Sequence, residues 1–596
     1  MKGKKMNLDR ATNPKLAIKK LFNFMKPYTK LIIIVVIFAI GSTVFAIVGP
    51  KILGNATTEL FNGVMKKLSG TGGINFTKIR NIIIFLLVLY TVSMIFSIIQ
   101  GLIMNRVSQK TGYELRKKLI EKIGKLPMKY FDDKTTGEVL SIITNDVDNL
   151  TQGLNQVSTQ VISSVITIIG ILIMMFSINF VMTIVSLLVL PFSLFIMASI
   201  SKKSQRYFKD QQDYLAKVNG NIEEMYGEQS IVKVFNAEEK LINNFEKNND
   251  VLYESAWKSQ FLTGLMHPIM IFVGNIGYAV IALLGGYYTI KGKISVGSIQ
   301  SFISYNKQFT HPLGQVAQIS NMIQSMIASS ERIFNFLEAD EEVDNGKVKL
   351  PSVVKGQISF EHVKFGYDEN KTIIKDFSID VKPGQKIAIV GPTGAGKTTI
   401  VKLLMRFYET NKGKITIDGI DIKDLKRNDL RSMFGMVLQD TWLFNGTIKD
   451  NLKYGNLKAT DEEVISAAKE AYVHHFIETQ SDGYDMIINE ETTNISGGQK
   501  QLLTIARAIL ADPKILILDE ATSSVDTRIE ILIQKAMDKL MKGRTSFIIA
   551  HRLSTIKNAD LILVVNNGEI IEQGKHSDLL KKSGFYAELY NSQFTK

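Results

Sequence analysis

The chain has 596 residues, too many for one hydrophobic core, so we expect at least two domains. A net charge of +14 would suit either nucleic acid or an anionic membrane surface. Long apolar runs favour the membrane, and no basic stretch is interleaved with aromatic residues, so we expect no nucleic acid partner. The sequence contains no cysteine, which excludes disulfides and thiolate metal sites.

Residues 1–30 are basic and contain one short apolar stripe at helical spacing, formed by Ile18, Leu21, Phe22 and Met25. The pattern predicts either an amphipathic helix on the inner membrane surface or a helix packed on protein, and it leaves both open. We expect no secretory signal peptide, because the first apolar run is long and lacks a small-residue cleavage site.

Six apolar runs of membrane-spanning length follow in the next three hundred residues. They cover residues 31–48, 81–104, 157–176, 180–200, 261–290 and about 294–327. The sixth run is the most polar; its polar side chains are Gln300, Asn306, Lys307, His311, Gln315 and Gln318. Lys307 could face a cavity or reach an interface, and Tyr305 and Phe309 could line a substrate cavity. An even number of spans places both termini on one side of the membrane.

The hydrophilic segments predict the orientation of these spans. Residues 1–30, 105–156 and 201–260 carry many Lys and Arg close to the spans, so we expect them to be cytoplasmic. The polar loop predicted at 50–80 also holds several lysines, which opposes this signal. The two long insertions have helical patterns, and we expect them to continue the spans into the cytoplasm, ending near 127–132 and 227–240. Such extensions could carry motion between the membrane and a soluble domain.

The second half of the chain contains a phosphate-binding loop. The sequence Gly391-Pro-Thr-Gly-Ala-Gly-Lys-Thr398 follows the apolar run 387–390 and precedes a helical pattern. Strand, glycine-rich loop and helix in this order form a P-loop, whose backbone N–H groups and helix N-terminus bind phosphate. The lysine would reach the β- and γ-phosphates, and the final threonine would hold Mg²⁺.

Further polar residues follow predicted strands or begin a helix. Asp519 and Glu520 end the buried run 515–518, where an aspartate can hold Mg²⁺ and a glutamate can take a proton from water. His551 follows the strand 546–550, beside that pair at the edge where ligands bind. Ser496 begins a helix, which makes a second anion site. Tyr367 could stack on adenine. Without the other motifs, the better interpretation of Tyr367 would be an aromatic residue at a strand end, packed in a minor core.

Together these motifs resemble the nucleotide-binding domain of ATP-binding cassette (ABC) transporters. With six spans ahead of it, the whole chain resembles a bacterial ABC exporter half-transporter of the multidrug and lipid-flippase type. Residues 391–398 match the Walker A motif, 515–520 the Walker B motif and 494–499 the family signature, whose usual Leu-Ser is Ile495-Ser496 here. Single positions match the A-, Q-, D- and H-loops: Tyr367, Gln439, Asp526 and His551.

The resemblance implies ATP and Mg²⁺ as ligands. The implied nucleotide-binding residues are Tyr367, Gly391, Pro392, Thr393, Gly394, Ala395, Gly396, Lys397, Thr398, Thr399, Ser496, Gly497, Gly498, Gln499 and Asp526. The implied Mg²⁺ ligands are Thr398, Gln439 and Asp519. Glu520 would be the catalytic base, with Gln439 beside Mg²⁺ and with Lys397 and His551 stabilising charge on the γ-phosphate.

The expected fold is a multi-domain chain, with an all-α six-helix transmembrane domain followed by an α/β P-loop ATPase domain. We expect an amphipathic segment at 1–30, the transmembrane domain at 31–330, a linker at 331–355 and the ATPase domain at 356–596. The resemblance implies a dimer in the cytoplasmic membrane with both termini and the ATPase domain in the cytoplasm. A heterodimer with a second half-transporter is slightly favoured over a homodimer.

Three functions fit this architecture. The first is ATP-driven export of small amphiphilic or hydrophobic compounds of the multidrug type by alternating access, with membrane lipids around the spans. The second is a flippase for lipid or a lipid-linked precursor. The third is an ATP-gated channel or regulatory subunit that moves no substrate uphill. An importer is disfavoured by the fused spans, and a peptidase-containing exporter by the short N-terminal segment and the lack of a cysteine nucleophile.

Overall fold

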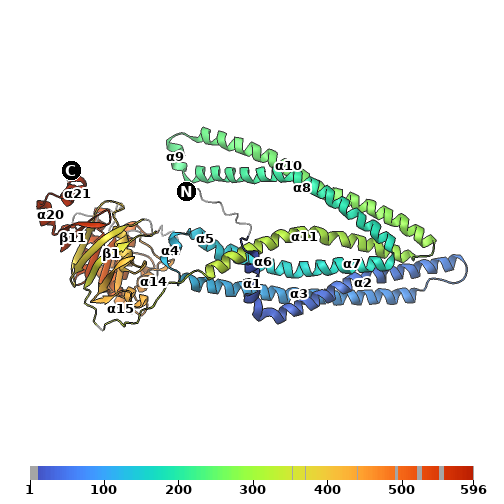
Figure 1. The fold of residues 1–596 in the computed structure, drawn as a ribbon, viewed down its shortest axis with the longest axis horizontal. Helices are drawn as coiled ribbons and strands as arrows, with labels where there is room; N and C mark the ends of the chain where they lie inside the picture. Colours follow the sequence, from blue (N-terminus) through green and yellow to red (C-terminus); the bar gives the residue numbers. More distant parts are fainter. Residues whose placement is uncertain are drawn as a thin grey trace. The chain divides into compact units, whose positions relative to one another are not determined.

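The computed structural model describes residues 11–594 except 352, 369–370, 439–440, 490–493, 520–525 and 550–555. The side chains of residues 190, 193–194, 267, 310–318, 320–321 and 593–594 also lie outside the described set. The chain forms two compact units (Figure 1). The helical unit contains residues up to 124 and Thr136–Ala339, and the sheet unit contains Lys125–Thr135 and the residues from Asp340 onward.

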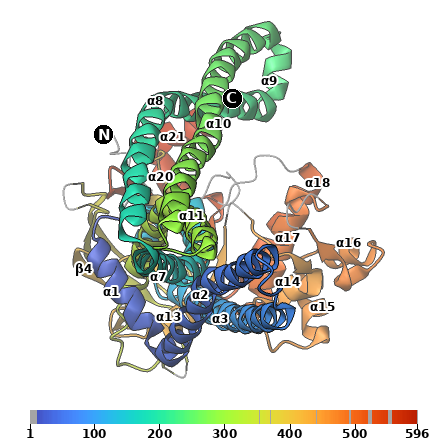
Figure 2. The same ribbon diagram turned by 90° about the vertical axis from the view of Figure 1, so that its right-hand side faces the viewer.

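The helical unit is built from long helices, several of them more than forty residues long. Its elements are α1 Pro14–Met25, η1 Lys26–Tyr28, α2 Thr29–Leu68, α3 Phe76–Ile123, α5 Thr136–Ser141, η2 Ile142–Asp146, α6 Val147–Gln156, η3 Val157–Val161, α7 Ile162–Ile178, α8 Phe180–Gly227, α9 Gln229–Val234, α10 Glu238–Ile290 and α11 Val296–Leu337. Helix α2 packs on α3, and α8 packs on α10. Figure 2 shows α8 and α10 running side by side, with α9 joining their ends.

The predicted apolar runs coincide with these long helices. Four helical stretches within the described part of the chain are long and apolar enough to cross a membrane: Pro14–Leu68, Phe76–Ile123, Thr136–Ile178 and Glu238–Ile290. A shorter apolar stretch, Phe180–Val189, begins α8 just before residues whose side chains are not described. The sixth run lies in α11, which continues to Leu337, into the range predicted as linker.

The loop predicted at 50–80 is wrong in extent, because α2 continues to Leu68 and α3 already begins at Phe76. Pro50 lies inside α2, and its carbonyl accepts a hydrogen bond from Ser301 Oγ at 2.8 Å. Asn75 caps α3 by accepting from the Lys78 N–H at 2.9 Å. Hydropathy reports the polarity of a segment and not its backbone conformation. A helix that continues beyond the membrane with polar residues is therefore mistaken for a loop. This connection and the turns at 178–179 and 291–295 lie at one end of the helical unit, which we call the hairpin end (Figure 1).

The N-terminal helix α1 is packed on protein along one face, which is one of the two predicted alternatives. Ala17, Leu21 and Met25 are buried, and α1 contacts α11. The rings of Phe24 and Phe334 meet edge to face with centroids 6.1 Å apart. Phe22, which the sequence places in the same apolar stripe, lies beside this face and is 70% exposed.

The sheet unit is organised around a ten-stranded mixed sheet with the order β5-β4-β1-β2-β12-β11-β3-β10-β9-β6. Its strands are β1 Ile358–Phe365, β2 Ile374–Val381, β3 Lys386–Val390, β4 Lys412–Ile417, β5 Ile420–Asp421, β6 Phe434–Val437, β9 Ile515–Asp519, β10 Thr545–Ile549, β11 Leu561–Asn566 and β12 Glu569–Gly574. A small second sheet pairs β7 Gly446–Thr447 with β8 Ile487–Ile488. Strands β11, β3, β10, β9 and β6 are parallel neighbours, and β1 pairs antiparallel with β2 and β4.

Helices accompany the strands throughout the sheet unit. They are α4 Met128–Asp132, α12 Lys397–Leu404, α13 Arg427–Ser432, α14 Ile448–Lys453, α15 Asp461–Glu470, α16 His474–Glu478, η4 Gly483–Asp485, α17 Gly497–Ala511, α18 Thr527–Met541, α20 His576–Lys581 and α21 Phe585–Phe594. Alternate residues of β9 enter different cores, because successive strand side chains point to opposite faces. Ile515 and Ile517 join the core that contains α12, whereas Leu516 and Leu518 join the core that contains α17. Apolar side chains on both faces hold the central strands in fixed positions.

Candidate functional site

The parallel strands bring several predicted site residues to one edge of the sheet. Strands β3, β10, β9 and β6 are adjacent and parallel, so their carboxyl ends lie at the same edge. The P-loop follows β3 there, and Asp519 is the last residue of β9. Three further predicted residues follow β6, β9 and β10 closely in the sequence; Gln439, Glu520 and His551 lie outside the described residues. The roles predicted for those three therefore stay predictions.

A side chain would clash with neighbouring atoms at two of the P-loop glycines. Gly396 immediately precedes α12 with a φ of 102°, and a Cβ there would lie 2.7 Å from Ile374 Cδ1. At Gly391 a Cβ would lie 2.1 Å from the carbonyl oxygen of Val565. Helix α12 has no capping side chain and no acidic residue in its first turn. Its first N–H groups and its dipole are therefore available to an anion such as phosphate.

Lys397 lies over the P-loop backbone. Its Nζ donates to the carbonyl oxygens of Gly391 at 2.7 Å and Pro392 at 3.0 Å. Burial lowers the pKa of Lys397, and the Asp519 carboxylate acts in the opposite direction. Phosphate oxygens could replace these two carbonyl oxygens as acceptors. Because phosphate is negatively charged and the carbonyls are neutral, its bonds to the Lys397 ammonium would be stronger. Thr393, Gly394 and Thr398 are exposed around the same loop, whereas Ala395 and Thr399 are buried.

Tyr367 lies beside the P-loop helix, and its role at adenine stays a prediction. Its hydroxyl is 3.3 Å from Thr399 Oγ1. The ring meets Phe365 and Tyr408 edge to face, each with centroids 5.0 Å apart. Lys402 Nζ lies 5.6 Å from the centroid of the Tyr367 ring. Tyr367 is thus part of an aromatic cluster at the nucleotide edge, and its position is fixed by packing.

The aromatic cluster is connected to α4, a connection that sequence analysis missed. The Tyr408 hydroxyl donates a hydrogen bond to the Asp132 carboxylate of α4, and Lys402 Nζ lies 3.9 Å from the same carboxylate. Burial, together with the hydrogen bond to Asp132, raises the pKa of Tyr408. Tyr367 is therefore linked to α4 through both Tyr408 and Lys402. No local pattern marks Tyr408, because its partner is 276 residues away in the chain.

The predicted signature forms the start of α17. Ser496 Oγ accepts from the Gln499 N–H at 3.3 Å, and Gln499 Oε1 accepts from the Ser496 N–H at 2.9 Å. This reciprocal capping box fixes the turn and leaves Ser496 and Gly497 exposed, while Gly498 is buried. Asp526 caps α18 by accepting from two backbone N–H groups at 3.0 Å. Asp526 therefore has a structural role, and its predicted role at the nucleotide stays a prediction.

Comparison with known proteins decides the family. A model of the ABC transporter transmembrane region matches residues 32–313, and a model of the ABC transporter matches residues 374–523. The fatty acid ABC transporter ATP-binding/permease protein of Mycobacterium bovis is 42% identical over 601 residues, covering 96% of this chain and 95% of that protein. The chain is an ABC transporter. A helical transmembrane domain precedes an ABC ATPase domain, which confirms the predicted fold class and the coupling of ATP hydrolysis to transport.

Two further relatives place this ABC transporter among the exporters. The ATP-dependent lipid A-core flippase of Syntrophus aciditrophicus is 35% identical and covers 84% of this chain and 83% of its own length. A solved structure of a bacterial Atm1-family ABC exporter with ATP bound has a TM-score of 0.73 at 28% identity, covering 96% of this chain and 99% of its own. The transporter is an ABC exporter, and exporters of this kind act as dimers.

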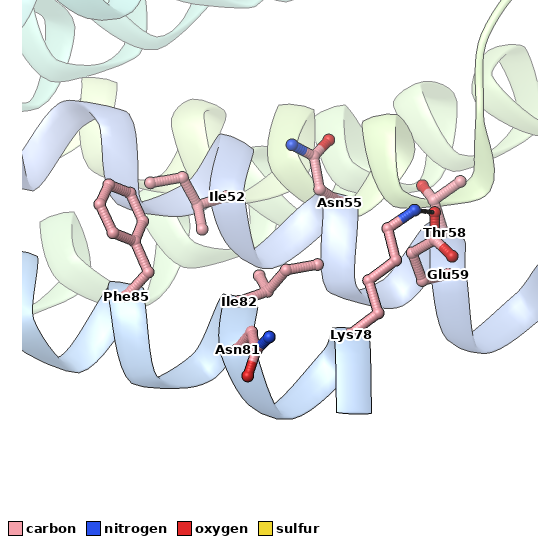
Figure 3. A pocket seen from close by; sticks show the side chains of 8 residues that line it. All are labelled: Ile52, Asn55, Thr58, Glu59, Lys78, Asn81, Ile82 and Phe85. Carbon is pink, nitrogen blue, oxygen red and sulfur yellow. Dashed lines mark hydrogen bonds and ion pairs between the residues drawn. The ribbon is translucent and has the colours of Figure 1, made fainter. Parts of the chain in front are cut away.

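The helical unit of the exporter contains a cavity between α2 and α3, near the hairpin end. Its volume is about 560 Å³, and it is lined by Ile52, Asn55, Thr58, Glu59, Lys78, Asn81, Ile82 and Phe85. Figure 3 shows the apolar side chains of Phe85, Ile52 and Ile82 toward one end, and Lys78 paired with Glu59 at the other. The cavity thus changes from apolar to charged along its length. Sequence analysis missed it, because these residues fall within the range predicted as a loop or at its edge.

Proposed function

We propose that this exporter moves lipid-like amphiphiles across the cytoplasmic membrane, driven by ATP hydrolysis. The observation that supports this substrate class best is the α2–α3 cavity, whose walls run from Phe85 and Ile82 to the Lys78–Glu59 ion pair. Such a wall suits a molecule with an apolar tail and a polar head. The names of a fatty acid transporter and a lipid flippase among the relatives agree with this class. Export of multidrug-type compounds is the alternative.

For the ATP site we propose the residue roles that the family motifs imply. Thr398, Asp519 and Gln439 supply hydroxyl, carboxylate and amide oxygens, which suit Mg²⁺. Mg²⁺ would neutralise charge on the phosphates of ATP. Glu520 accepts a proton from the attacking water, and Lys397 and His551 stabilise charge at the γ-phosphate. The signature residues 496–499, of which Ser496 and Gly497 are exposed, complete the site of the partner chain, so each site is shared between two chains.

We also propose the orientation and the partner. The basic segments and both termini face the cytoplasm, and the hairpin end faces the outside. The partner is a second half-transporter, with a heterodimer slightly favoured, or a second copy of this chain. The native mass of this chain purified alone distinguishes the two. A dimer indicates that the partner is a second copy, and a monomer indicates that a different half-transporter is required.

The experiment that tests the substrate class uses sealed proteoliposomes with ATP on the side of the ATPase domain. Uptake or flipping of a fluorescent fatty acid and of a fluorescent phospholipid is compared with that of a cationic drug dye, with Glu520→Gln as the inactive control. ATP-dependent movement of a lipid-like probe against its gradient supports the proposal. Movement of the dye alone would make the multidrug alternative correct, and no uphill movement of any probe would favour a channel or regulatory subunit.

A further inference from the structure

Both segments that lead from the helical unit into the sheet unit meet at one point. The helical unit ends at Gly124 after α3 and at Ala339 after α11. Just inside the sheet unit, the Glu342 N–H donates to the Lys125 carbonyl at 2.8 Å. Glu342 follows Leu337, the last residue of α11, by only five positions. A displacement of α11 therefore reaches Glu342 through a short connection.

Glu342 belongs to a buried charge cluster whose other members come from α13 and from the turn after α12. Arg431 Nη2 donates to the two carboxylate oxygens of Glu342 at 3.1 Å and 3.3 Å, and Arg427 Nη1 lies 3.8 Å from the first of them. Arg427 Nη2 and Arg406 Nε both donate to Glu409, at 2.7 Å and 2.8 Å. The side chains of Arg406, Arg427 and Glu342 are 6%, 9% and 15% exposed. We call these five residues the linker cluster.

Arg427 joins the segment after α11 to the turn after the P-loop helix through a single guanidinium. Its Nε donates to the Val343 carbonyl at 3.2 Å, and its Nη1 donates to the Arg406 carbonyl. The backbone N–H of Arg427 donates to the Asp344 carboxylate at 3.1 Å. A lysine carries one nitrogen in place of this planar fork, so it could not bond to these separate acceptors at the same time.

Arg406 has a backbone conformation that residues with a Cβ seldom adopt. Its φ is 52°, in the left-handed region, and it follows the end of α12 by two residues. The Arg406 guanidinium also donates to the carbonyls of Ile422 and Leu425, at 3.2 Å and 3.0 Å. Strained residues persist where the surrounding contacts fix them. The contacts of Arg406 therefore fix the direction in which the chain leaves the P-loop helix.

The linker cluster connects Glu342 to two elements of the nucleotide edge. One is α12, which follows the P-loop, and the other is α13, which is separated from β6 by Met433 alone. The bond between Tyr408 and Asp132 reaches the same turn after α12 from α4. Buried ion pairs contribute little net stability, because desolvation offsets their attraction, so stability alone does not account for the cluster.

We propose that the linker cluster transmits displacement between the P-loop helix and the end of α11, with Glu342 and Arg427 as its positioning residues. When nucleotide shifts α12, the turn after α12 moves Arg427, and Arg427 and Arg431 together move Glu342. Breaking the cluster leaves nucleotide binding in place and interrupts this path, while the separate path from Tyr408 to α4 remains. The coupling does not depend on which substrate the exporter moves.

The test measures hydrogen–deuterium exchange of the transporter dimer in lipid nanodiscs, with and without Mg²⁺ and the non-hydrolysable ATP analogue AMP-PNP. In the wild type, nucleotide should change exchange in peptides of the P-loop and in peptides covering residues 322–337 of α11. Glu342→Gln should keep the P-loop response and reduce the α11 response by about half or more. Arg427→Lys should do the same, because it keeps the charge and loses the fork. Arg431→Lys should keep most of the α11 response, because Arg431 bonds to Glu342 through one nitrogen.

The matched control is Glu572→Gln. Glu572 is also half-buried, and its carboxylate accepts from the N–H groups of Phe585 and Tyr586 at 2.9 Å and 3.0 Å, but these bonds join β12 to α21. Glu572→Gln should lower Tm and leave the α11 response unchanged.

Four results would overturn the proposed coupling. They are a wild-type α11 response in Glu342→Gln and Arg427→Lys, an equal loss in Glu572→Gln, loss of the P-loop response together with the α11 response, and no α11 response in the wild type. Because Glu342 and Arg427 lie on opposite sides of the linker cluster, either variant decides the question if the other does not fold.

Discussion

Replacing Asp146 should destabilise the helical unit far more than replacing Asp148, although both aspartates pair with an arginine. Asp146 is 3% exposed, and its carboxylate accepts from Arg332 at 2.8 Å and 2.5 Å and from Ser329 at 2.9 Å. These bonds tie η2 to α11. Asp148 pairs with Arg116 on α3, and the Asp148 side chain is 55% exposed. The two sites thus differ mainly in burial.

The burial sets the expected magnitudes. Removing one partner of a fully buried pair costs about 3–5 kcal/mol of unfolding free energy. The Arg332 side chain is 27% exposed, so we expect Asp146→Asn to lie at or below the lower end of that range. Breaking an exposed pair costs about 0–1 kcal/mol, because water screens both charges. Asn keeps the shape of Asp, so Asp146→Asn and Asp148→Asn remove charge without creating a cavity.

The assay is thermal unfolding of both variants in the same nanodiscs. Asp146→Asn should lower Tm clearly, Asp148→Asn should stay near the wild type, and Asp146→Asn combined with Arg332→Met should recover part of the loss. Equal Tm shifts for the two single variants would refute the reasoning, since it assigns most of the difference to burial.

Three variants of the sheet unit and one pH dependence give further predictions. Gly396→Ala should lower ATP affinity in a nucleotide titration, because its Cβ would lie 2.7 Å from Ile374 Cδ1. Lys397→Ala should weaken ATP binding itself; unchanged affinity would exclude Lys397 from phosphate binding. Tyr408→Phe should retain ATP affinity and reduce transport per ATP hydrolysed, because only the bond to Asp132 is lost. Burial raises the Tyr408 pKa, so the neutral hydroxyl and its contribution to stability persist below the ordinary value near 10 and are lost as pH rises through the raised pKa. Transport per ATP in the wild type should therefore not change through this group between about pH 6 and about pH 9.

Features determined by local sequence were predictable. The uncharged runs coincide with long helices because a backbone in lipid must satisfy its own hydrogen bonds. The P-loop at 391–398 was identified because its glycines and lysine act within one strand–loop–helix unit. The break near 127–132 was also predicted, and the structure places the short helix α4 there.

Features determined by contacts between distant segments were missed. The bond between Tyr408 and Asp132 joins segments 276 residues apart, and the local sequence around either residue does not indicate the other. The cavity between α2 and α3 exists because both helices extend beyond their apolar runs, which hydropathy cannot indicate. The packing of α1 on α11 required knowing which surface was available to Leu21 and Met25. In each of these cases the feature depends on a contact with a segment distant in the sequence, which local patterns do not indicate.

The measurement that tests the central claim most directly is Mg-ATPase activity together with native mass, on this chain purified alone in lipid nanodiscs. Glu520→Gln is the control. An ATP-hydrolysing exporter whose sites are shared between two chains should be a dimer whose turnover vanishes in the variant. If this chain requires a different second chain, turnover should appear only when that chain is added. Full turnover by a monomer, or turnover that persists unchanged in Glu520→Gln, would contradict the shared site and the assignment of the catalytic base.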